Sequence, residues 1–254
     1  EPASREMDML TIGAAFVVVG VGGMGSIPGA FIAALLVAEL KAICIWLGVQ
    51  DIAGVEISFS KLTLVVEFLV MAVVLIWRPW GLLGKPQSLS RNGGEHERPL
   101  QPAGRAATSG WVALLAALVL LPLVTGDASS YSTVLLTDIF IAALFAASLH
   151  FILGPGGMHS FGHAAYFGLG AYGAALVVRS LDLSMPAALL LGPLVAAAGA
   201  LLYGWFCVRL SGVYLTMLTL AFAQINWAIV FQWDDFTGGS NGVTGVWPPE
   251  WASN

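Results

Sequence analysis

Charged residues are scarce in this chain of 254 residues. Only 10% of the residues are Asp, Glu, Lys or Arg, whereas soluble proteins carry about a quarter. Hydrophobic residues make up 58% of the chain, and its mean hydropathy is +0.85. This balance excludes a soluble globular domain, so the chain is predicted to be an integral membrane protein. With ten basic residues in all, we expect no nucleic-acid partner.

Cysteine is also rare, and a phosphate-binding loop is missing. Cys44 and Cys207 both lie within apolar runs, which predicts buried free thiols rather than a disulfide. Gly81, Gly84 and Lys85 lack the spacing, and the Ser or Thr after the lysine, of a loop that binds phosphate. We therefore expect no cofactor. No charged stretch followed by a cleavable apolar run opens the sequence, so we predict no signal peptide and expect a piece of a longer protein.

Long apolar runs, in contrast, are abundant. A helix of about 20 residues crosses a membrane, and the runs are continuous rather than alternating, which favours helices over a barrel. We predict an all-α polytopic membrane protein with about seven transmembrane helices and one partial helix at 10–21. The full spans are predicted at 28–47, 62–78, 109–126, 134–153, 162–179, 186–208 and 212–232. An acidic loop with Asp51 and Glu56 is expected after the first of them.

A polar stretch at 87–108 separates two groups of spans. It is too poor in apolar residues to bury a core, so we predict a flexible linker between domains at 1–86 and 109–254. Half of the basic residues of the chain lie in or beside it, namely Arg78, Lys85, Arg91, Arg98 and Arg105. Because basic loops stay in the cytoplasm, the linker is predicted to be cytoplasmic.

A glycine-rich motif at 154–172 reads G-x-x-G-x-x-S-x-G-H-A-A-[FY]-F-G-x-G-A-Y. Its fixed positions are Gly154, Gly157, Ser160, Gly162, His163, Ala164, Ala165, Phe167, Gly168, Gly170, Ala171 and Tyr172. The motif resembles the signature of one permease subunit of the branched-chain amino-acid ABC importers. The stretches 209–225 and 237–245 resemble the same family at matching distances, so the resemblance covers about residues 134–248.

Two upstream stretches, 22–30 and 78–84, resemble the carboxyl-terminal part of the partner permease subunit. The chain is thus similar to the end of one subunit joined by a linker to the beginning of the other. The resemblance implies an ABC-importer permease fold and a permease component of an ATP-driven importer for branched-chain amino acids or similar small polar substrates. It implies no enzymatic activity in this chain, and a place in the inner membrane of the cell. The partners implied are ATPase subunits, an external substrate-binding protein, the remaining permease segments and the lipid bilayer.

The small residues of the motif are predicted to lie on a helix. Ala164 and Gly168 stand four apart, as do Gly170 and Ala174, so a helix face without bulk is expected to contact another helix closely. The pentapeptides at 22–26 and 156–160 share the pattern Gly-Gly-Met-x-Ser, and both precede a predicted helix. This similarity arises either by chance or because the two segments belong to related permease halves.

Polar side chains within the apolar spans are candidates for a translocation path or for a helix break. These candidates are Ser160, His163, Tyr166, Tyr172, Gln224, Asn226, Glu39 and Glu67. Ser160 is predicted to cap a helix, and His163 to bond a backbone carbonyl or to contact substrate. The two amides of the 212–232 span could bind a zwitterion or another helix. Glu39 and Glu67 are expected to face polar groups of a partner subunit or an aqueous path, and Lys41 to extend outward.

The glycine-rich loop after the last span is either a string of turns or an external docking surface. Its candidate residues are Gly238, Gly239, Ser240, Asn241 and Gly242. A hydrolase or metal site is disfavoured, because no carboxylate accompanies His159, Ser160 and His163. Two other classes stay open, an ion-coupled secondary transporter and a non-transporting membrane scaffold.

Overall fold

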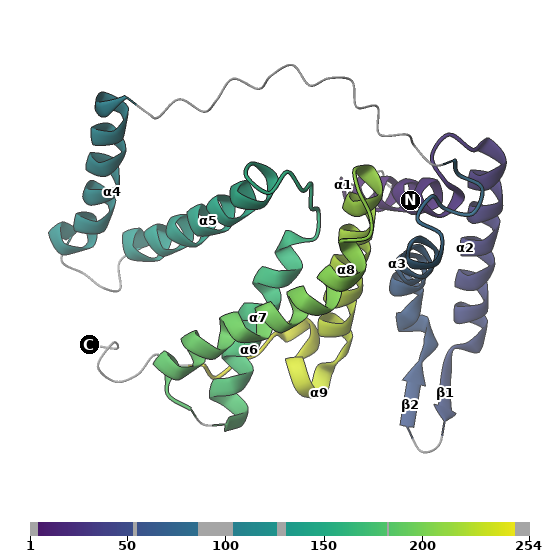
Figure 1. Ribbon diagram of the computed structural model, residues 1–254. Coiled ribbons are helices and arrows are strands. Elements are labelled where there is room, and N and C mark those ends of the chain that lie inside the picture. The colour runs from purple at the N-terminus through teal and green to yellow at the C-terminus, as the bar shows by residue number, and fades with distance from the viewer. Residues whose placement is uncertain (1–4, 53–54, 86–103, 126–130, 182, 247–254) are drawn as a thin grey trace. The chain divides into compact units, whose positions relative to one another are not determined.

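The structure is a computed structural model that describes residues 5–52, 55–85, 104–125, 131–181 and 183–246 (Figure 1). It confirms the all-α prediction. The long helices are α1 (Arg5–Gly22), α2 (Ile27–Leu47), α3 (Phe59–Trp77), α4 (Arg105–Thr125), α5 (Tyr131–Leu153), α6 (His163–Leu181), α7 (Met185–Cys207) and α8 (Val213–Gln232). A short helix α9 (Asp234–Thr237) and a 3-10 turn η1 (Gly239–Asn241) follow.

Five of the described helices are long and apolar enough to cross a membrane. They are α2, α5 over Val134–Leu153, α6, α7 and α8. Shorter apolar stretches lie in α1, α3 and α4, at Thr11–Gly22, Val65–Trp77 and Thr108–Leu118. Together with the apolar composition, these helices make the chain a multi-pass membrane protein.

The loop predicted around Asp51 and Glu56 contains a β-hairpin. Strands β1 (Val49–Ile52) and β2 (Val55–Ser58) pair antiparallel, with Asp51 opposite Glu56. Gly48, with φ +57°, turns the chain out of α2, and its carbonyl accepts from the N–H of Phe59 at 2.8 Å. Both strands contain β-branched residues, which favour an extended backbone.

The chain divides into two units, Ser88–Phe151 and a larger unit of Glu1–Gln87 with Ile152–Asn254. The smaller unit holds α4 and most of α5, whose large apolar side chains, such as Trp111 and Leu144, are exposed. Helix α4 begins at Arg105, inside the predicted linker 87–108. Residues 87–103 of that linker, like residues 247–254 of the chain, lie outside the described part.

Helix α8 forms the centre of the larger unit. Half of its membrane window is buried, against 6–17% for the other four candidate spans. It packs against α1 and α3 in one hydrophobic core. Core residues from these three helices include Val17, Val21, Phe68, Met71, Leu75, Tyr214, Met217 and Leu218. Segments before and after the predicted linker therefore share one core.

The break between α1 and α2 is held by the turn that follows α3. The N–H of Leu82 donates to the carbonyl of Val21 at 2.8 Å, and the N–H of Leu83 donates to that of Gly22 at 3.1 Å. Gly23, at the centre of the break, has φ +96° and leaves no room for a Cβ beside the backbone of Gly84. The two glycines allow the two backbones to touch.

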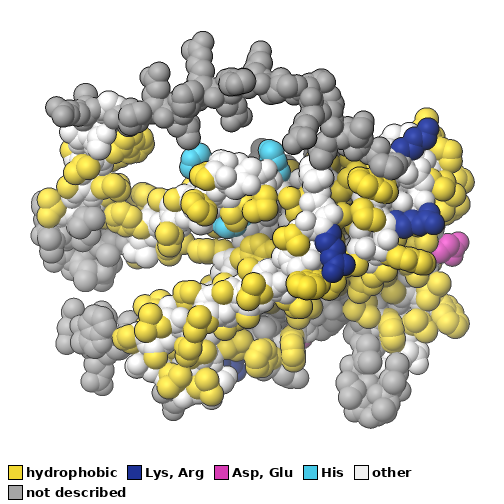
Figure 2. Space-filling view, viewed as in Figure 1, with side chains coloured by type: hydrophobic (Ala, Val, Ile, Leu, Met, Phe, Trp, Pro, Cys, Tyr) yellow, Lys and Arg dark blue, Asp and Glu magenta, His cyan; other side chains and the backbone are white. Residues whose placement is uncertain are grey.

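Among the side chains that Figure 2 colours, hydrophobic ones predominate and few are charged. Large apolar residues on the outer helices are exposed, for example Phe31 on α2 and Leu201 on α7. In water such a surface would be unfavourable, but acyl chains solvate it well. The surface thus agrees with a chain surrounded by lipid or by other membrane helices.

Candidate functional site

Two glycine breaks contact the central helix α8 through the same kind of bond. The N–H of Met24, between α1 and α2, donates to the hydroxyl of Tyr214 at 3.4 Å. The N–H of Phe161, between α5 and α6, donates to the hydroxyl of Thr219 at 3.1 Å. These breaks are the two segments that share the Gly-Gly-Met-x-Ser pattern. Helix α8 thus holds both of them with side-chain hydroxyls.

The break before α6 lies directly on the backbone of α8. A Cβ on Gly162 would overlap the carbonyl oxygen of Thr219, so glycine alone fits at this position. The hydroxyl of Ser160 accepts from the N–H of Gly162 at 3.3 Å, two residues on, which forms a local turn. The prediction that Ser160 caps the helix is corrected, because Gly162 is the residue that precedes the first helical one. The helix itself begins one residue later, at His163.

The glycines of α6 serve two different purposes. Gly170 and Gly173 face α7: a Cβ on Gly173 would lie 2.8 Å from Val195, and one on Gly192 of α7 would lie 2.8 Å from the carbonyl oxygen of Gly170. This close approach confirms the predicted small-residue packing at Gly170. At Gly168 the same prediction is wrong, because an added Cβ would meet nothing within 4 Å. The face that carries Ala164 and Gly168 opens on a cavity instead.

This difference gives a first testable prediction. Gly173→Ala should lower the free energy of unfolding by about 1–3 kcal/mol, because its methyl group overlaps Val195. Gly168→Ala should be neutral or stabilising by up to about 1 kcal/mol, since glycine is a poor helix former. Thermal unfolding of the protein in lipid nanodiscs measures both effects. Equal unfolding temperatures for the two variants would contradict the assignment of the two faces.

The first cavity, which we call the α6–α8 cavity, has a volume of about 530 Å³. Its lining residues are Phe161, Ala164, Ala165, Gly168, Tyr172, Leu220, Ala223, Gln224, Asn226, Trp227, Val230, Phe231 and Gly239. None of them is charged, and the side-chain polar groups are one phenol, two amides and the indole N–H of Trp227. Asn226 is only 8% exposed, and within the described part of the chain its amide makes no hydrogen bond. Its polar atoms are therefore available to a molecule in the cavity.

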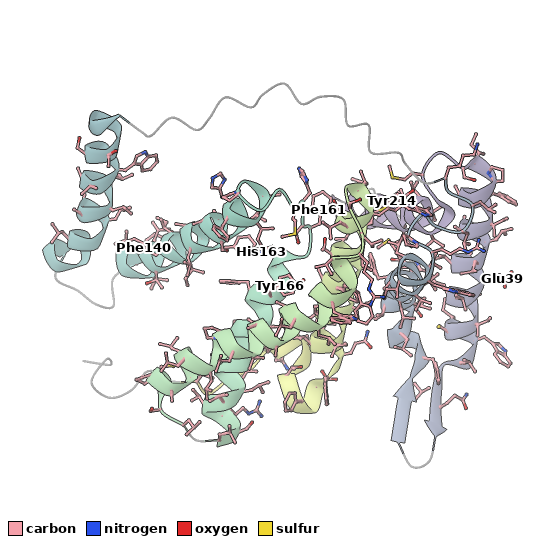
Figure 3. The ribbon with its side chains drawn as sticks, viewed as in Figure 1. Glu39, Phe140, Phe161, His163, Tyr166 and Tyr214 are labelled. Atoms are coloured by element: carbon pink, nitrogen blue, oxygen red, sulfur yellow. The ribbon has the colours of Figure 1, made fainter. Side chains whose placement is uncertain are left out.

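The second cavity, which we call the α6–α7 cavity, has a volume of about 650 Å³. Its polar or polarisable lining includes Ser160, His163, Tyr166, Cys207 and Thr219, and small residues of α7 form one wall. Figure 3 shows Phe161, His163 and Tyr166 around the start of α6. The rings of His163 and Tyr166 meet edge to face, with centroids 6.5 Å apart. This cavity is predominantly apolar.

The two glutamates lie elsewhere. Glu67 of α3 is buried, and its carboxylate forms an ion pair with Lys41 of α2 at 2.5 Å. The prediction for Lys41 is therefore corrected, because its ammonium group pairs with Glu67 and does not extend freely outward. For Glu67 the pair supplies a countercharge within this chain, and a place on an aqueous path stays a prediction. This ion pair joins α2 to α3. The distance between the two residues along the sequence does not reveal that these helices contact each other. Glu39 is exposed on α2, well away from His163 and Tyr166 (Figure 3).

The loop Gly238–Gly242 folds into tight turns at the end of α8. Gly238, Gly239 and Gly242 have φ of +77°, +54° and +69°, and Gly239 lines the α6–α8 cavity. The hydroxyl of Thr237 donates to the carbonyls of Val230 and Trp233, at 2.5 and 2.7 Å, and so fixes the loop to the helix. The predicted turns are confirmed, and Gly239 places the loop beside the cavity.

The structure thus groups Tyr172, Gln224 and Asn226 in one cavity and Ser160, His163 and Tyr166 in the other. Sequence analysis missed three residues that now matter. Trp227 and Phe231 line the α6–α8 cavity and stack with centroids 5.0 Å apart, and Thr219 anchors the glycine break. The four-residue spacing of Ala223, Trp227 and Phe231 was a usable signal, because it places all three on one helix face.

Comparison with known proteins identifies relatives of one part of the chain. Residues 131–251 match a family model described as branched-chain amino acid transport system, permease component. No solved structure matches the chain significantly.

Three curated relatives are high-affinity branched-chain amino acid transport system permease proteins. LivM of Salmonella typhimurium is 31% identical over 113 residues, which are 44% of this chain and 27% of the relative. LivM of Escherichia coli is 32% identical over 114 residues, 45% of this chain and 26% of the relative. BraD of Pseudomonas aeruginosa is 37% identical over 73 residues, 29% of this chain and 20% of the relative. The matched part thus spans about a quarter of these relatives.

Proposed function

We propose that this chain is a membrane permease component of an ATP-driven importer, because residues 131–251 match the family model of branched-chain amino acid transport permease components. The substrates would be branched-chain amino acids or similar small polar molecules. The chain would form part of the path through the membrane, and ATP hydrolysis would take place on a separate ATPase subunit.

The α6–α8 cavity is the observation that carries this proposal. It combines two amides and a phenol with the rings of Trp227 and Phe231, and all of its described lining residues are uncharged. A neutral zwitterion with an apolar side chain suits such a site, since the amides can bond the ammonium and carboxylate groups while the rings contact the side chain. A substrate with net charge would lack a countercharge there.

We also propose that the chain is a fused permease. Residues 1–86 would be the carboxyl-terminal part of one subunit and residues 109–254 the amino-terminal part of the other. The shared core of α1, α3 and α8, and the edge-to-face contact of Trp80 with Tyr214 at 6.1 Å, support this pairing. A covalent link keeps the two parts at high effective concentration.

The proposed arrangement in the inner membrane follows from the basic residues. A cytoplasmic segment 87–108 puts Arg209 inside and the loop Gly238–Gly242 outside. That loop would meet an external substrate-binding protein, and ATPase subunits would dock on the cytoplasmic side through permease segments beyond this chain. The α6–α8 cavity would then lie next to the docking loop.

Uptake of labelled leucine tests the proposal. The assembled importer, reconstituted in vesicles with its ATPase and binding protein, should accumulate leucine only when ATP and the binding protein are both present. Leucine accumulation driven by an ion gradient alone would favour a secondary transporter instead. Undiminished leucine uptake by cells after deletion of the chain would favour the scaffold.

A change at Asn226 tests the role of the cavity. Asn226→Leu should lower the efficiency of leucine uptake about 10- to 100-fold. The substrate loses a hydrogen bond, and with it a binding free energy of about 1–3 kcal/mol. Thr216→Val is the matched control: Thr216 is also a buried polar residue of α8 but lines neither cavity, and its hydroxyl donates to the carbonyl of Gly212. An equal loss of uptake in both variants would contradict the assignment.

A further inference from the structure

The two cavities follow one another along α8. The α6–α8 cavity uses residues of this helix from Leu220 to Phe231, whereas the α6–α7 cavity uses residues up to Thr219. On the other wall the residues around the glycine break alternate between the two cavities: Phe161, Ala164 and Ala165 line the first, whereas Ser160, His163 and Tyr166 line the second. The two cavities therefore lie on different faces of the start of α6, on either side of the contact between the break and Thr219.

Between these two faces the break packs tightly against α8. Gly162 and Thr219 are both buried, and the backbone of Gly162 lies so close to the carbonyl of Thr219 that no Cβ fits between them. The N–H of Phe161 donates to the hydroxyl of Thr219 at 3.1 Å. The start of α6 and its contact with Thr219 thus lie between the two cavities.

The threonine hydroxyl is oriented for this contact. It donates its own hydrogen to the carbonyl of Thr216 at 2.8 Å, which leaves its lone pairs to accept from Phe161. The bond to the break joins two neutral groups, and such bonds can be exchanged for others at small net cost. The contact can therefore hold the segment in place and still release it.

We propose that Thr219 and Gly162 form the partition of the translocation path, with the α6–α7 cavity as a second substrate compartment on the far side. This inference rests on the proposed function. A neutral amino acid would pass from the α6–α8 cavity to the α6–α7 cavity when the 161–162 backbone leaves Thr219. Thr219 would act as a positioning residue, because it places the segment that blocks the path.

The other glycine break provides a matched control. Tyr214 also lies on α8, is buried and accepts from a backbone N–H, that of Met24. It lines neither cavity. Removal of its hydroxyl disturbs the packing of a break on α8 without touching the partition.

Leucine leakage through the assembled importer tests the partition. Vesicles containing the complex are loaded with labelled leucine, and its release is followed without ATP. Thr219→Val should raise the release about two- to tenfold, the factor that one lost neutral hydrogen bond gives. Thr219→Ser, which keeps the hydroxyl, and Tyr214→Phe should release leucine as slowly as the wild type. Gly162→Ala, whose methyl group pushes the segment off Thr219, should leak like Thr219→Val.

Each outcome bears on the proposal. Slow release by folded Thr219→Val and Gly162→Ala complexes would overturn it, and so would equal leakage by Tyr214→Phe, since general loosening would then be the cause. Folding is checked by thermal unfolding of each complex. A wild-type complex that takes up no leucine with ATP and binding protein would instead overturn the proposed function, a result distinct from the absence of a leak.

Discussion

Gly23→Ala, in the break between α1 and α2, should destabilise the protein strongly. The added Cβ would overlap the backbone of Gly84, and φ at this position is +96°, which residues with a Cβ rarely adopt. Backbone strain costs about 1–3 kcal/mol and overpacking about 1–3 kcal/mol. Together they should lower the free energy of unfolding by about 2–6 kcal/mol. Thermal unfolding in nanodiscs should show a correspondingly lower midpoint.

Gly25→Ala is the control for this experiment. Gly25 lies two residues on in the same break and has φ +81°, but an added Cβ would meet nothing within 4 Å. Only the backbone strain of about 1–2 kcal/mol is then expected. A Gly23→Ala protein as stable as Gly25→Ala would show that the turn after α3 does not pack on this break.

Glu67→Ala is the second change with a large expected effect. It leaves the ammonium group of Lys41 without its carboxylate between α2 and α3, and breaking a buried pair in this way costs about 3–5 kcal/mol. Because the lysine side chain is 34% exposed, the lower end, about 3 kcal/mol, is expected. The unfolding midpoint of the protein in nanodiscs measures this loss.

Two companion variants separate charge pairing from packing. Lys41→Met with Glu67→Gln removes both charges and should recover most of the stability, since neither partner is left unpaired. The exchanged pair, Lys41→Glu with Glu67→Lys, should also be more stable than Glu67→Ala. If neither double variant is more stable than Glu67→Ala, the ion pair is not what holds α2 and α3 together.

Local signals in the sequence predicted the helices well. The span predicted at 212–232 is α8 (Val213–Gln232), and the span predicted at 162–179 is α6 (His163–Leu181). Apolar length and the glycine breaks decide such boundaries, and both can be read within a few turns of chain. The turns at Gly238 and the bond of Ser160 to Gly162 were predictable for the same reason.

Contacts between distant segments could not be predicted in this way. The ion pair of Lys41 with Glu67 depends on how α2 packs against α3, and the sequence offers several polar partners at membrane depth. Small residues occur on two faces of α6, so spacing alone could not tell that Gly173 packs on α7 while Gly168 faces a cavity. The division of the candidate residues into two cavities is likewise a result of tertiary packing.

Substrate protection of a cysteine in the α6–α8 cavity is the most direct test of a path along α8. Ala223 lines this cavity, whereas Ile229, six residues on, is 47% exposed and lines neither cavity. Cys44 and Cys207 are first replaced by alanine, and Ala223→Cys or Ile229→Cys is then introduced. Labelling by a small thiol reagent is followed in the assembled importer with ATP and binding protein. We predict that leucine slows labelling at position 223 and leaves it unchanged at position 229. Equal labelling with and without leucine at position 223 would contradict a path through this cavity.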